Sequence, residues 1–292
     1  MQRLERSMSK IISYFLQSIL IYLFFFIGRL LGLKISRKLF SNLFLLIGPF
    51  FKSKKIVQKN LHIFSSKLSD KLKLRITNEM WKNYGKTFIE YAYLNHFRKK
   101  NLYVTFKGEE NLNQIKKLKK PVIFVSGHFA NFELMSMEIT KKDIKLATIY
   151  RPLNNIFLNP FMEYLRKKYI CKNQIKKGIN GVRESINYLK KGCSIALMVD
   201  QRVSEGKKIN FFGKPSLTTT LPAQLALKFN LKILPVFIER DNDDKFIIEF
   251  QKPIDGEVYK DKLHLSEKLN KILEEMIVKN PYQWIWTHNR WK

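Results

Sequence analysis

After residue 101, short apolar runs alternate with longer amphipathic segments, and this alternation restricts the possible folds more than any other feature of the chain. The run 121–125 (PVIFV) holds no polar residue, as is typical of a strand buried on both faces. Further strands are predicted at 144–150, 194–199, 233–238 and 246–250, and helices at 131–141, 155–169, 181–190, 219–229 and 262–278. This order predicts an α/β layered domain with a mostly parallel sheet flanked by helices.

An uncharged stretch near the N-terminus predicts a helix in front of that domain. No charged residue lies between Lys10 and Arg29, and residues 11–28 are mainly Ile, Leu, Phe and Tyr. Because about 20 helical residues cross a hydrocarbon core of ~30 Å, we expect an N-terminal membrane-anchor helix. No Ala-x-Ala type cleavage site lies nearby, which favours a retained anchor over a signal peptide. The alternative is a buried core helix.

A second apolar run, 39–51, is too short to span a membrane and predicts an interfacial or packing helix. We therefore expect residues 1–51 to form the membrane anchor and interfacial helix. Residues 52–292 would form a helical connector followed by the α/β domain. More basic residues follow the first apolar run than precede it, so the positive-inside tendency places most of the chain on the cytoplasmic face.

The net charge of +30, from 54 Lys and Arg against 24 Asp and Glu, predicts a polyanionic partner. Nucleic acid, an anionic membrane surface and an acidic substrate all fit, and so does a general compositional bias toward lysine. Two cysteines, Cys171 and Cys193, are too few for a disulfide framework or a zinc site. Since no cluster has metal-ligand spacing either, we expect no metal and no cofactor.

His128 and Glu133 are the residues best placed for catalysis. His128 follows a strand end, where reactive groups of parallel sheets gather, and it precedes a helix. On one regular helix the two side chains would lie about 140° apart. With His128 in a turn, however, the Glu133 carboxylate could reach the imidazole, fix its tautomer and leave the other ring nitrogen free as a general base. The alternative is that Glu133 only favours the helix N-terminus electrostatically.

A family resemblance begins with residues 127–133, which read Gly-His-Phe-Ala-Asn-Phe-Glu. They resemble the His-x-x-x-x-Asp/Glu motif of the glycerophospholipid acyltransferase superfamily. Within it they resemble the Gly-His-Phe-Gly-Asn-Trp-Glu segment of the late (lauroyl/myristoyl) acyltransferases of lipid A biosynthesis, with departures at Ala130 and Phe132. Five further segments resemble other blocks of this family and occur in the same order. They are residues 150–155, 200–202, 211–213, 218–220 and the Trp-rich terminus 281–291.

These blocks supply candidate substrate-binding residues, each of which also has a plainer interpretation. Arg151 and Arg202 fall at predicted strand ends, where a guanidinium could clamp a phosphate or carboxylate, or could be a surface arginine. Asp200 could orient Arg202 or an acceptor hydroxyl, or could cap a strand end. Asn131 could bind substrate or cap the helix that follows it. The terminal tryptophans are expected to be core residues or membrane-interface anchors.

The resemblance implies transfer of a fatty acyl chain from an acyl carrier protein thioester to a hydroxyl of a lipid A precursor, at the bacterial inner membrane. His128 would act as general base assisted by Glu133, and backbone N–H groups after His128, aided by Arg151, would stabilise the oxyanion. One alternative is a lysophospholipid or other glycolipid O-acyltransferase. A remote alternative, for which no nucleic-acid-binding module is visible, is a membrane-anchored nucleic-acid-binding protein. The partners expected are therefore acyl carrier protein, the lipid A precursor and the membrane, and no nucleic acid.

Overall fold

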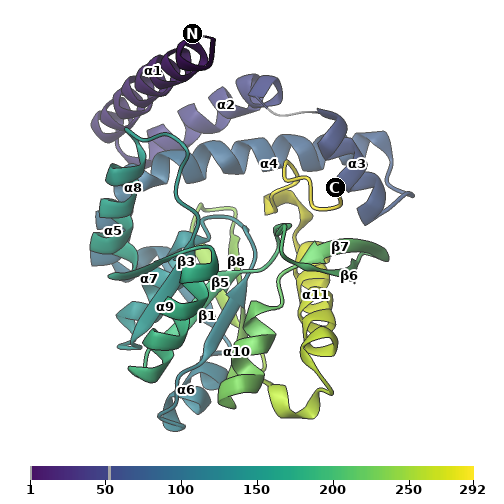
Figure 1. Cartoon of the computed structure of the whole chain (residues 1–292). Coiled ribbons are helices and arrows are strands. Elements are labelled where there is room, and N and C mark those ends of the chain that lie inside the picture. Colours follow the sequence, from purple (N-terminus) through teal and green to yellow (C-terminus); the bar gives the residue numbers. More distant parts are fainter. Residues whose placement is uncertain (1, 52–53) are drawn as a thin grey trace.

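A mostly parallel eight-stranded sheet forms the centre of the computed structural model, which describes residues 2–51 and 54–292 (Figure 1). The strand order is β1-β9-β8-β2-β5-β3-β4, with β10 beside β8, and only the β8–β9 and β8–β10 pairs are antiparallel. The strands are β1 (Val104–Lys107), β2 (Ile123–Ser126), β3 (Leu146–Tyr150), β4 (Asn173–Lys176), β5 (Ser194–Met198), β8 (Lys232–Arg240), β9 (Phe246–Phe250) and β10 (Ile254–Asp255). The predicted fold class is confirmed.

Helices cover both faces of this sheet. On one face lies α9, whose Gly181 backbone approaches β4 so closely that a Cβ there would be 2.3 Å from the Lys176 carbonyl oxygen. On the other face Tyr150 of β3 donates a hydrogen bond to Glu163 of α8. The helices after β1 are α6 (Glu109–Lys117), α7 (Glu133–Lys141), α8 (Asn159–Leu165), α9 (Ile179–Lys190), α10 (Leu221–Phe229) and α11 (Lys262–Lys279).

A layer of N-terminal helices lies across the end of the sheet at which β2 leads to His128 (Figure 1). It consists of α1 (Gln2–Leu31), α2 (Leu33–Phe51), α3 (Lys54–Phe64) and α4 (Asp70–Glu90), and α5 (Leu94–Lys99) follows at the side of the domain beside α7. α2 and α4 pack closely, because a Cβ at Gly85 of α4 would lie only 2.0 Å from the Phe40 carbonyl oxygen of α2. The second apolar run therefore lies in a helix that packs on α4, while an interfacial role for its exposed apolar side chains stays a prediction.

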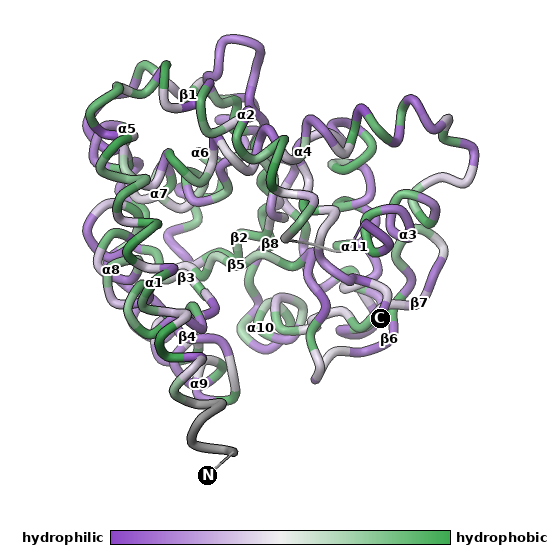
Figure 2. Tube along the Cα trace, turned by 90° about the horizontal axis from the view of Figure 1, so that it is seen from above, coloured by the Kyte–Doolittle hydropathy of each residue, from purple (hydrophilic) through white to green (hydrophobic). Residues whose placement is uncertain are grey.

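α1 is apolar on almost all sides, and from Met8 to Leu31 it is long and apolar enough to cross a membrane. Most of its large apolar side chains are exposed, so it is not a buried core helix. In Figure 2 its trace is coloured largely as hydrophobic. It nevertheless contacts the segment between β3 and α8. Asn155 donates a hydrogen bond to the Tyr14 carbonyl oxygen, and Tyr22 donates one to the Phe157 carbonyl oxygen. The expected boundary between residues 51 and 52 adjoins residues 52–53, which lie outside the described residues.

Several elements differ from the sequence predictions. The helix predicted at 155–169 begins only at Asn159. The side-chain oxygen of Asn155 accepts hydrogen bonds from the backbone N–H groups of Phe157 and Leu158 and holds these residues in a turn. The helix continues into a π-helical turn, Arg166–Ile170. Strands β1 and β4 and a separate antiparallel hairpin, β6 (Lys207–Phe211) with β7 (Lys214–Thr218), were not predicted. Each of these strands contains at least two polar residues and none is a continuous apolar run, which hides them from a search for buried apolar strands.

Candidate active site

His128 lies in a tight turn between β2 and α7. The turn is possible because Gly127 lacks a side chain: a Cβ there would lie 2.7 Å from the Phe129 ring and 3.3 Å from Cβ of Asp200. Ala130 adopts a left-handed conformation (φ 43°), which reverses the chain before α7 begins at Glu133. β2 and β5 are parallel neighbours, so the residues that follow them, His128 and Asp200, meet at one edge of the sheet.

The Asp200 carboxylate holds His128 by two contacts. Its Oδ1 lies 2.7 Å from His128 Nδ1, and its Oδ2 accepts the His128 backbone N–H at 2.8 Å. A third donor, the indole N–H of Trp284, reaches Oδ2 at 2.9 Å. Burial raises the pKa of the Asp200 carboxyl, but the charge and hydrogen bonds of His128 and the bond from Trp284 outweigh it, so this pKa lies below its usual range. In a neutral imidazole, a carboxylate at Nδ1 favours the tautomer that carries its proton on Nδ1, so that the lone pair lies on Nε2.

The sequence predicted that the Glu133 carboxylate reaches the His128 imidazole, but the structure does not bring these two side chains together. The Glu133 carboxylate instead accepts hydrogen bonds from Tyr91 at 2.6 Å and from Arg166 at 2.8 Å. The reason is geometric: Glu133 begins α7, and its side chain points to Tyr91 and to Arg166 of the π-helical turn, while His128 turns toward Asp200 at the end of β5. The carboxylate that pairs with the imidazole is therefore that of Asp200, and a catalytic role for Glu133 stays a prediction.

Asn131 is also placed differently from its predicted substrate-binding position. It is 1% exposed, and its side-chain amide donates a hydrogen bond to Glu90 Oε2 at 2.9 Å. It does not cap α7 either, because no side-chain cap hydrogen bond is present at that helix start. Asn131 is thus a buried part of the turn that carries His128.

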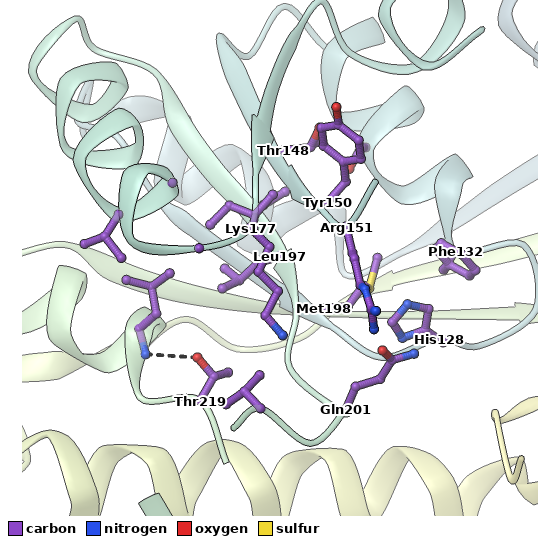
Figure 3. Close-up of a pocket in the computed structure, with 18 of the residues that line it drawn as sticks. His128, Phe132, Thr148, Tyr150, Arg151, Lys177, Leu197, Met198, Gln201 and Thr219 are labelled. Atoms are coloured by element: carbon purple, nitrogen blue, oxygen red, sulfur yellow. Dashed lines mark hydrogen bonds between the residues drawn. The ribbon is translucent and has the colours of Figure 1, made fainter. Parts of the chain in front are cut away.

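A pocket with a volume of about 410 Å³ opens beside His128 at the carboxyl edge of the sheet. Arg151, Gln201 and His128 all point into it (Figure 3). Arg202 and Lys177 line it as well, so its polar wall is strongly cationic. The predicted substrate-binding residues Arg151 and Arg202 are therefore together with His128, and both are free of ion pairs among residues 2–51 and 54–292.

The pocket extends over both faces of the sheet edge. On the α7 side it is lined by Met135, Thr148 and Tyr150, and on the α9 side by Ile149, Leu197 and Val182. Mixed apolar and polar walls suit a substrate with both a hydrocarbon chain and a polar head. Within the described residues no group of three or more His, Cys, Asp or Glu side chains is arranged to hold a metal ion.

The Trp-rich terminus supplies contacts that sequence reasoning missed. Trp284 and Trp286 are fully buried, as core residues would be, but Trp284 also binds Asp200. His288 Nε2 accepts the backbone N–H of Arg202 at 2.9 Å, so this imidazole is neutral. Burial lowers the pKa of His288 to about 4, and Asp200 opposes that shift only in part. The order of the motif blocks was a signal that this segment returns to the site, but it carried no contact information.

Two backbone N–H groups expected to stabilise an oxyanion are already used. The N–H of Phe129 donates to the Gly127 carbonyl oxygen at 2.9 Å, and that of Ala130 donates to the Gln283 carbonyl oxygen at 3.2 Å. These two donors hold the turn itself, and stabilisation of an oxyanion by backbone N–H groups after His128 stays a prediction. Arg151 remains as a cationic donor on the pocket wall.

Comparisons with known proteins agree over nearly the whole chain. Residues 5–292 match the family model described as bacterial lipid A biosynthesis acyltransferase. The chain is 25% identical over 253 residues to the lipid A biosynthesis palmitoleoyltransferase of Escherichia coli K12, a match that covers 84% of this chain and 80% of the relative. It is 22% identical over 244 residues to the lauroyltransferase of the same organism, covering 82% and 78%. Among solved structures, a 1-acyl-sn-glycerophosphate acyltransferase from Thermotoga maritima matches with a TM-score of 0.42 and 16% identity, over 87% of this chain and 100% of that chain.

Proposed function

Since the chain belongs to the bacterial lipid A biosynthesis acyltransferase family, we propose that it transfers a fatty acyl chain from an acyl carrier protein thioester to a hydroxyl of a lipid A precursor. The observation that carries this proposal is the His128–Asp200 pair at the mouth of a cationic pocket with apolar walls. Asp200 binds Nδ1 and leaves Nε2 to act as a general base. Asp200 thus takes the orienting role that the spacing argument gave to Glu133.

The reaction is a direct transfer. His128 Nε2 removes the proton of the acceptor hydroxyl as the oxygen attacks the thioester carbonyl carbon. Arg151 donates hydrogen bonds to the oxyanion that forms, and Asp200 stabilises the imidazolium. When the tetrahedral intermediate collapses, the C–S bond breaks and His128 returns its proton to the leaving sulfur. The products are an ester and the free thiol, and no acyl–enzyme bond is needed because the thioester is already activated.

The charges around the pocket support anionic substrates. Arg202 and Arg151 can bind phosphate groups of the acceptor, and the acidic acyl carrier protein would be attracted by the positive charge of the whole chain. Burial lowers the pKa of Lys177, another cation of the wall, and an anionic ligand would counter that effect. We place Glu133 in the same wall, where it holds Arg166 in position.

We further propose that residues 1–51 attach the enzyme to the inner membrane and that residues 52–292 carry out the acyl transfer on its cytoplasmic face. The exposed apolar surface of α1 supports this division. Basic residues concentrated after α1 support the orientation.

Mass spectrometry of a lipid A precursor, incubated with membranes that contain the protein and with acylated carrier protein, tests the proposed function. We expect the mass of one added acyl chain with the intact protein and none with His128→Ala. His264→Ala, which removes an exposed imidazole outside the pocket, is the matched control and should leave the reaction unchanged. Acyl transfer by a folded His128→Ala variant would refute the proposal.

A further inference from the structure

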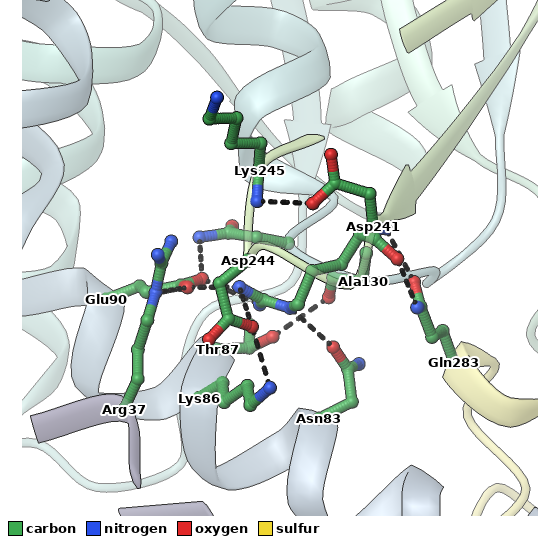
Figure 4. Close-up of polar contacts among 12 residues, drawn as sticks. Arg37, Asn83, Lys86, Thr87, Glu90, Ala130, Asp241, Asp244, Lys245 and Gln283 are labelled. Atoms are coloured by element: carbon green, nitrogen blue, oxygen red, sulfur yellow. Dashed lines mark hydrogen bonds and ion pairs between the residues drawn. The ribbon is translucent and has the colours of Figure 1, made fainter. Parts of the chain in front are cut away.

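A buried ion cluster adjoins the turn that carries His128, and Figure 4 shows its contacts together with Ala130 of that turn. At its centre the Glu90 carboxylate, at the end of α4, is fully buried. Its Oε1 accepts from Arg37 Nε at 2.7 Å and from Arg240 Nη1 at 2.5 Å, and its Oε2 accepts from Arg240 Nη2 at 3.0 Å. The cluster thus joins α2, α4 and the end of β8.

The fourth hydrogen bond to this carboxylate comes from the turn itself, where the side-chain amide of Asn131 donates to Oε2 at 2.9 Å. A second bond from α4 holds the same turn, since Thr87 Oγ1 donates to the Ala130 carbonyl oxygen at 3.0 Å. Gln283 completes the support: its carbonyl oxygen accepts the Ala130 N–H, and its side chain forms two 2.8 Å hydrogen bonds with the Arg240 backbone. None of these contacts involves His128 or Asp200 themselves.

We propose that Glu90 is a positioning residue for catalysis, which acts through Asn131 to hold the turn that presents His128 to the substrates. This inference rests on the proposed role of His128. The left-handed conformation of Ala130 needs such support, because a non-glycine residue does not hold it unaided. Burial raises the pKa of the Glu90 carboxyl, but Arg240 and Arg37 outweigh it and keep this pKa below its usual range, so the acceptor stays charged.

The cluster also explains a sequence feature that the proposed reaction does not use. Asn131 lies within the motif segment, yet its side chain is turned away from the pocket and is almost fully buried. A buried polar side chain costs free energy unless it is hydrogen-bonded, so its value lies in the bond to Glu90. Through that bond, the packing of α2 against α4 fixes the position of the His128 imidazole relative to the end of the sheet.

Steady-state kinetics of Asn131→Ala provide the main test, because this variant cuts the tether and leaves the Glu90 ion pairs intact. A misplaced base slows the chemical step without weakening substrate binding, so we expect kcat to fall about 10-fold to 100-fold with KM nearly unchanged. The pH dependence of kcat/KM should keep its shape, since the His128–Asp200 pair is untouched. Thr87→Val, which removes the other bond from α4, should lower kcat in the same direction.

A double-mutant cycle separates positioning from general destabilisation. If Glu90 acts through Asn131, then Glu90→Gln lowers kcat in the wild-type background but changes it little once Asn131→Ala is present. Its effect on the melting temperature should persist in both backgrounds, because two buried guanidinium groups lose their counter-charge in each. Glu79→Gln, the same substitution on the same helix at a partly exposed pair with Lys82, should leave kcat unchanged.

Wild-type kcat in a folded Asn131→Ala variant would overturn the inference, and so would multiplicative effects of the two substitutions on kcat. Where Glu90→Gln does not fold, Asn131→Ala and Thr87→Val still decide the outcome. Failure of the proposed function has a different signature, because His128→Ala would then retain acyl transfer. Loss of transfer in His128→Ala together with full activity in Asn131→Ala refutes the positioning role alone.

Discussion

Replacement of Asp200 by asparagine removes one charge and almost no volume, so its effect on catalysis follows directly from the contacts of this side chain. The Oδ2 position receives two N–H donors, from the His128 backbone and from Trp284, and must stay an oxygen. The amide nitrogen would therefore take the Oδ1 position, 2.7 Å from His128 Nδ1. An amide N–H facing Nδ1 forces the imidazole proton onto Nε2, and the general base is lost.

The magnitude of the effect comes from the lost stabilisation of the imidazolium. Asp200 is completely buried, so solvent does not screen the pair directly. Opposite unit charges about 4 Å apart attract by roughly 4 kcal/mol at an effective dielectric constant of about 20. Each ~1.4 kcal/mol of transition-state stabilisation corresponds to about a tenfold change in rate, so Asp200→Asn should lower kcat roughly 10³-fold. The unfavourable tautomer adds to this loss.

Release of the free carrier thiol gives the rate, and the mass of the lipid product confirms that the thiol comes from acyl transfer. The variant must first melt cooperatively, since loss of the buried charge also affects stability. Asp243→Asn, an exposed carboxylate on the turn after β8, is the matched control and should retain the wild-type rate. A folded Asp200→Asn variant whose kcat stays within about tenfold of the wild type would show that Asp200 does not orient or stabilise the catalytic imidazole.

Three further predictions follow from the contacts around the pocket and in the helical layer. Glu133→Gln should lower kcat/KM but leave the pKa values in its pH profile in place, because Asp200 remains at the imidazole; a shifted profile would return Glu133 to the catalytic pair. His288 has its pKa lowered to about 4, so its contribution to stability is present above pH ~6.5 and is lost as the pH falls toward 4. His288→Gln, which keeps an acceptor but does not titrate, should therefore flatten the fall in melting temperature over that range, and an unchanged slope would contradict this. Gly85→Ala should destabilise the protein by several kcal/mol, because the added Cβ of α4 clashes with the backbone of α2. Gly28→Ala should destabilise it less, because there the added Cβ meets a movable isoleucine side chain. Equal melting temperatures of these two variants would disprove close packing at Gly85.

The fold could be predicted because its central strands are buried on both faces and their apolar character is continuous. The run that forms β2 is the clearest case, since all four of its residues are buried. The β6–β7 hairpin shows why the rest was missed. In β6 two consecutive exposed lysines precede the buried Ile209 and Phe211, so the strand has no long apolar run. The turn of the hairpin depends on Phe212 and Gly213, which both adopt left-handed conformations.

The site was predictable in position but only partly in pairing. The rule that parallel strands end at one edge of a sheet brings His128 and Asp200 together although they lie 72 residues apart. The spacing of the motif suggested Glu133 instead, because local spacing carries no information about Arg166, which takes that carboxylate from 33 residues away. Contacts such as Trp284 to Asp200, across 84 residues, depend on how the chain terminus packs and are not visible in any local pattern.

The attachment of α1 to the rest of the molecule has an evolutionary consequence. Asn155 binds the carbonyl oxygen of Tyr14, while Ser36 and Tyr93 both bind that of Gly28, so three of the polar contacts to this helix use its main chain. A main-chain carbonyl is present whatever side chain occupies the position. Apolar residues of α1 can therefore be exchanged among Ile, Leu, Phe and Val during evolution, while the helix keeps its hydrogen bond to the segment that follows Arg151. Substitutions should therefore accumulate faster in α1 than at Asn155, Ser36 and Tyr93, whose side chains bind its main chain.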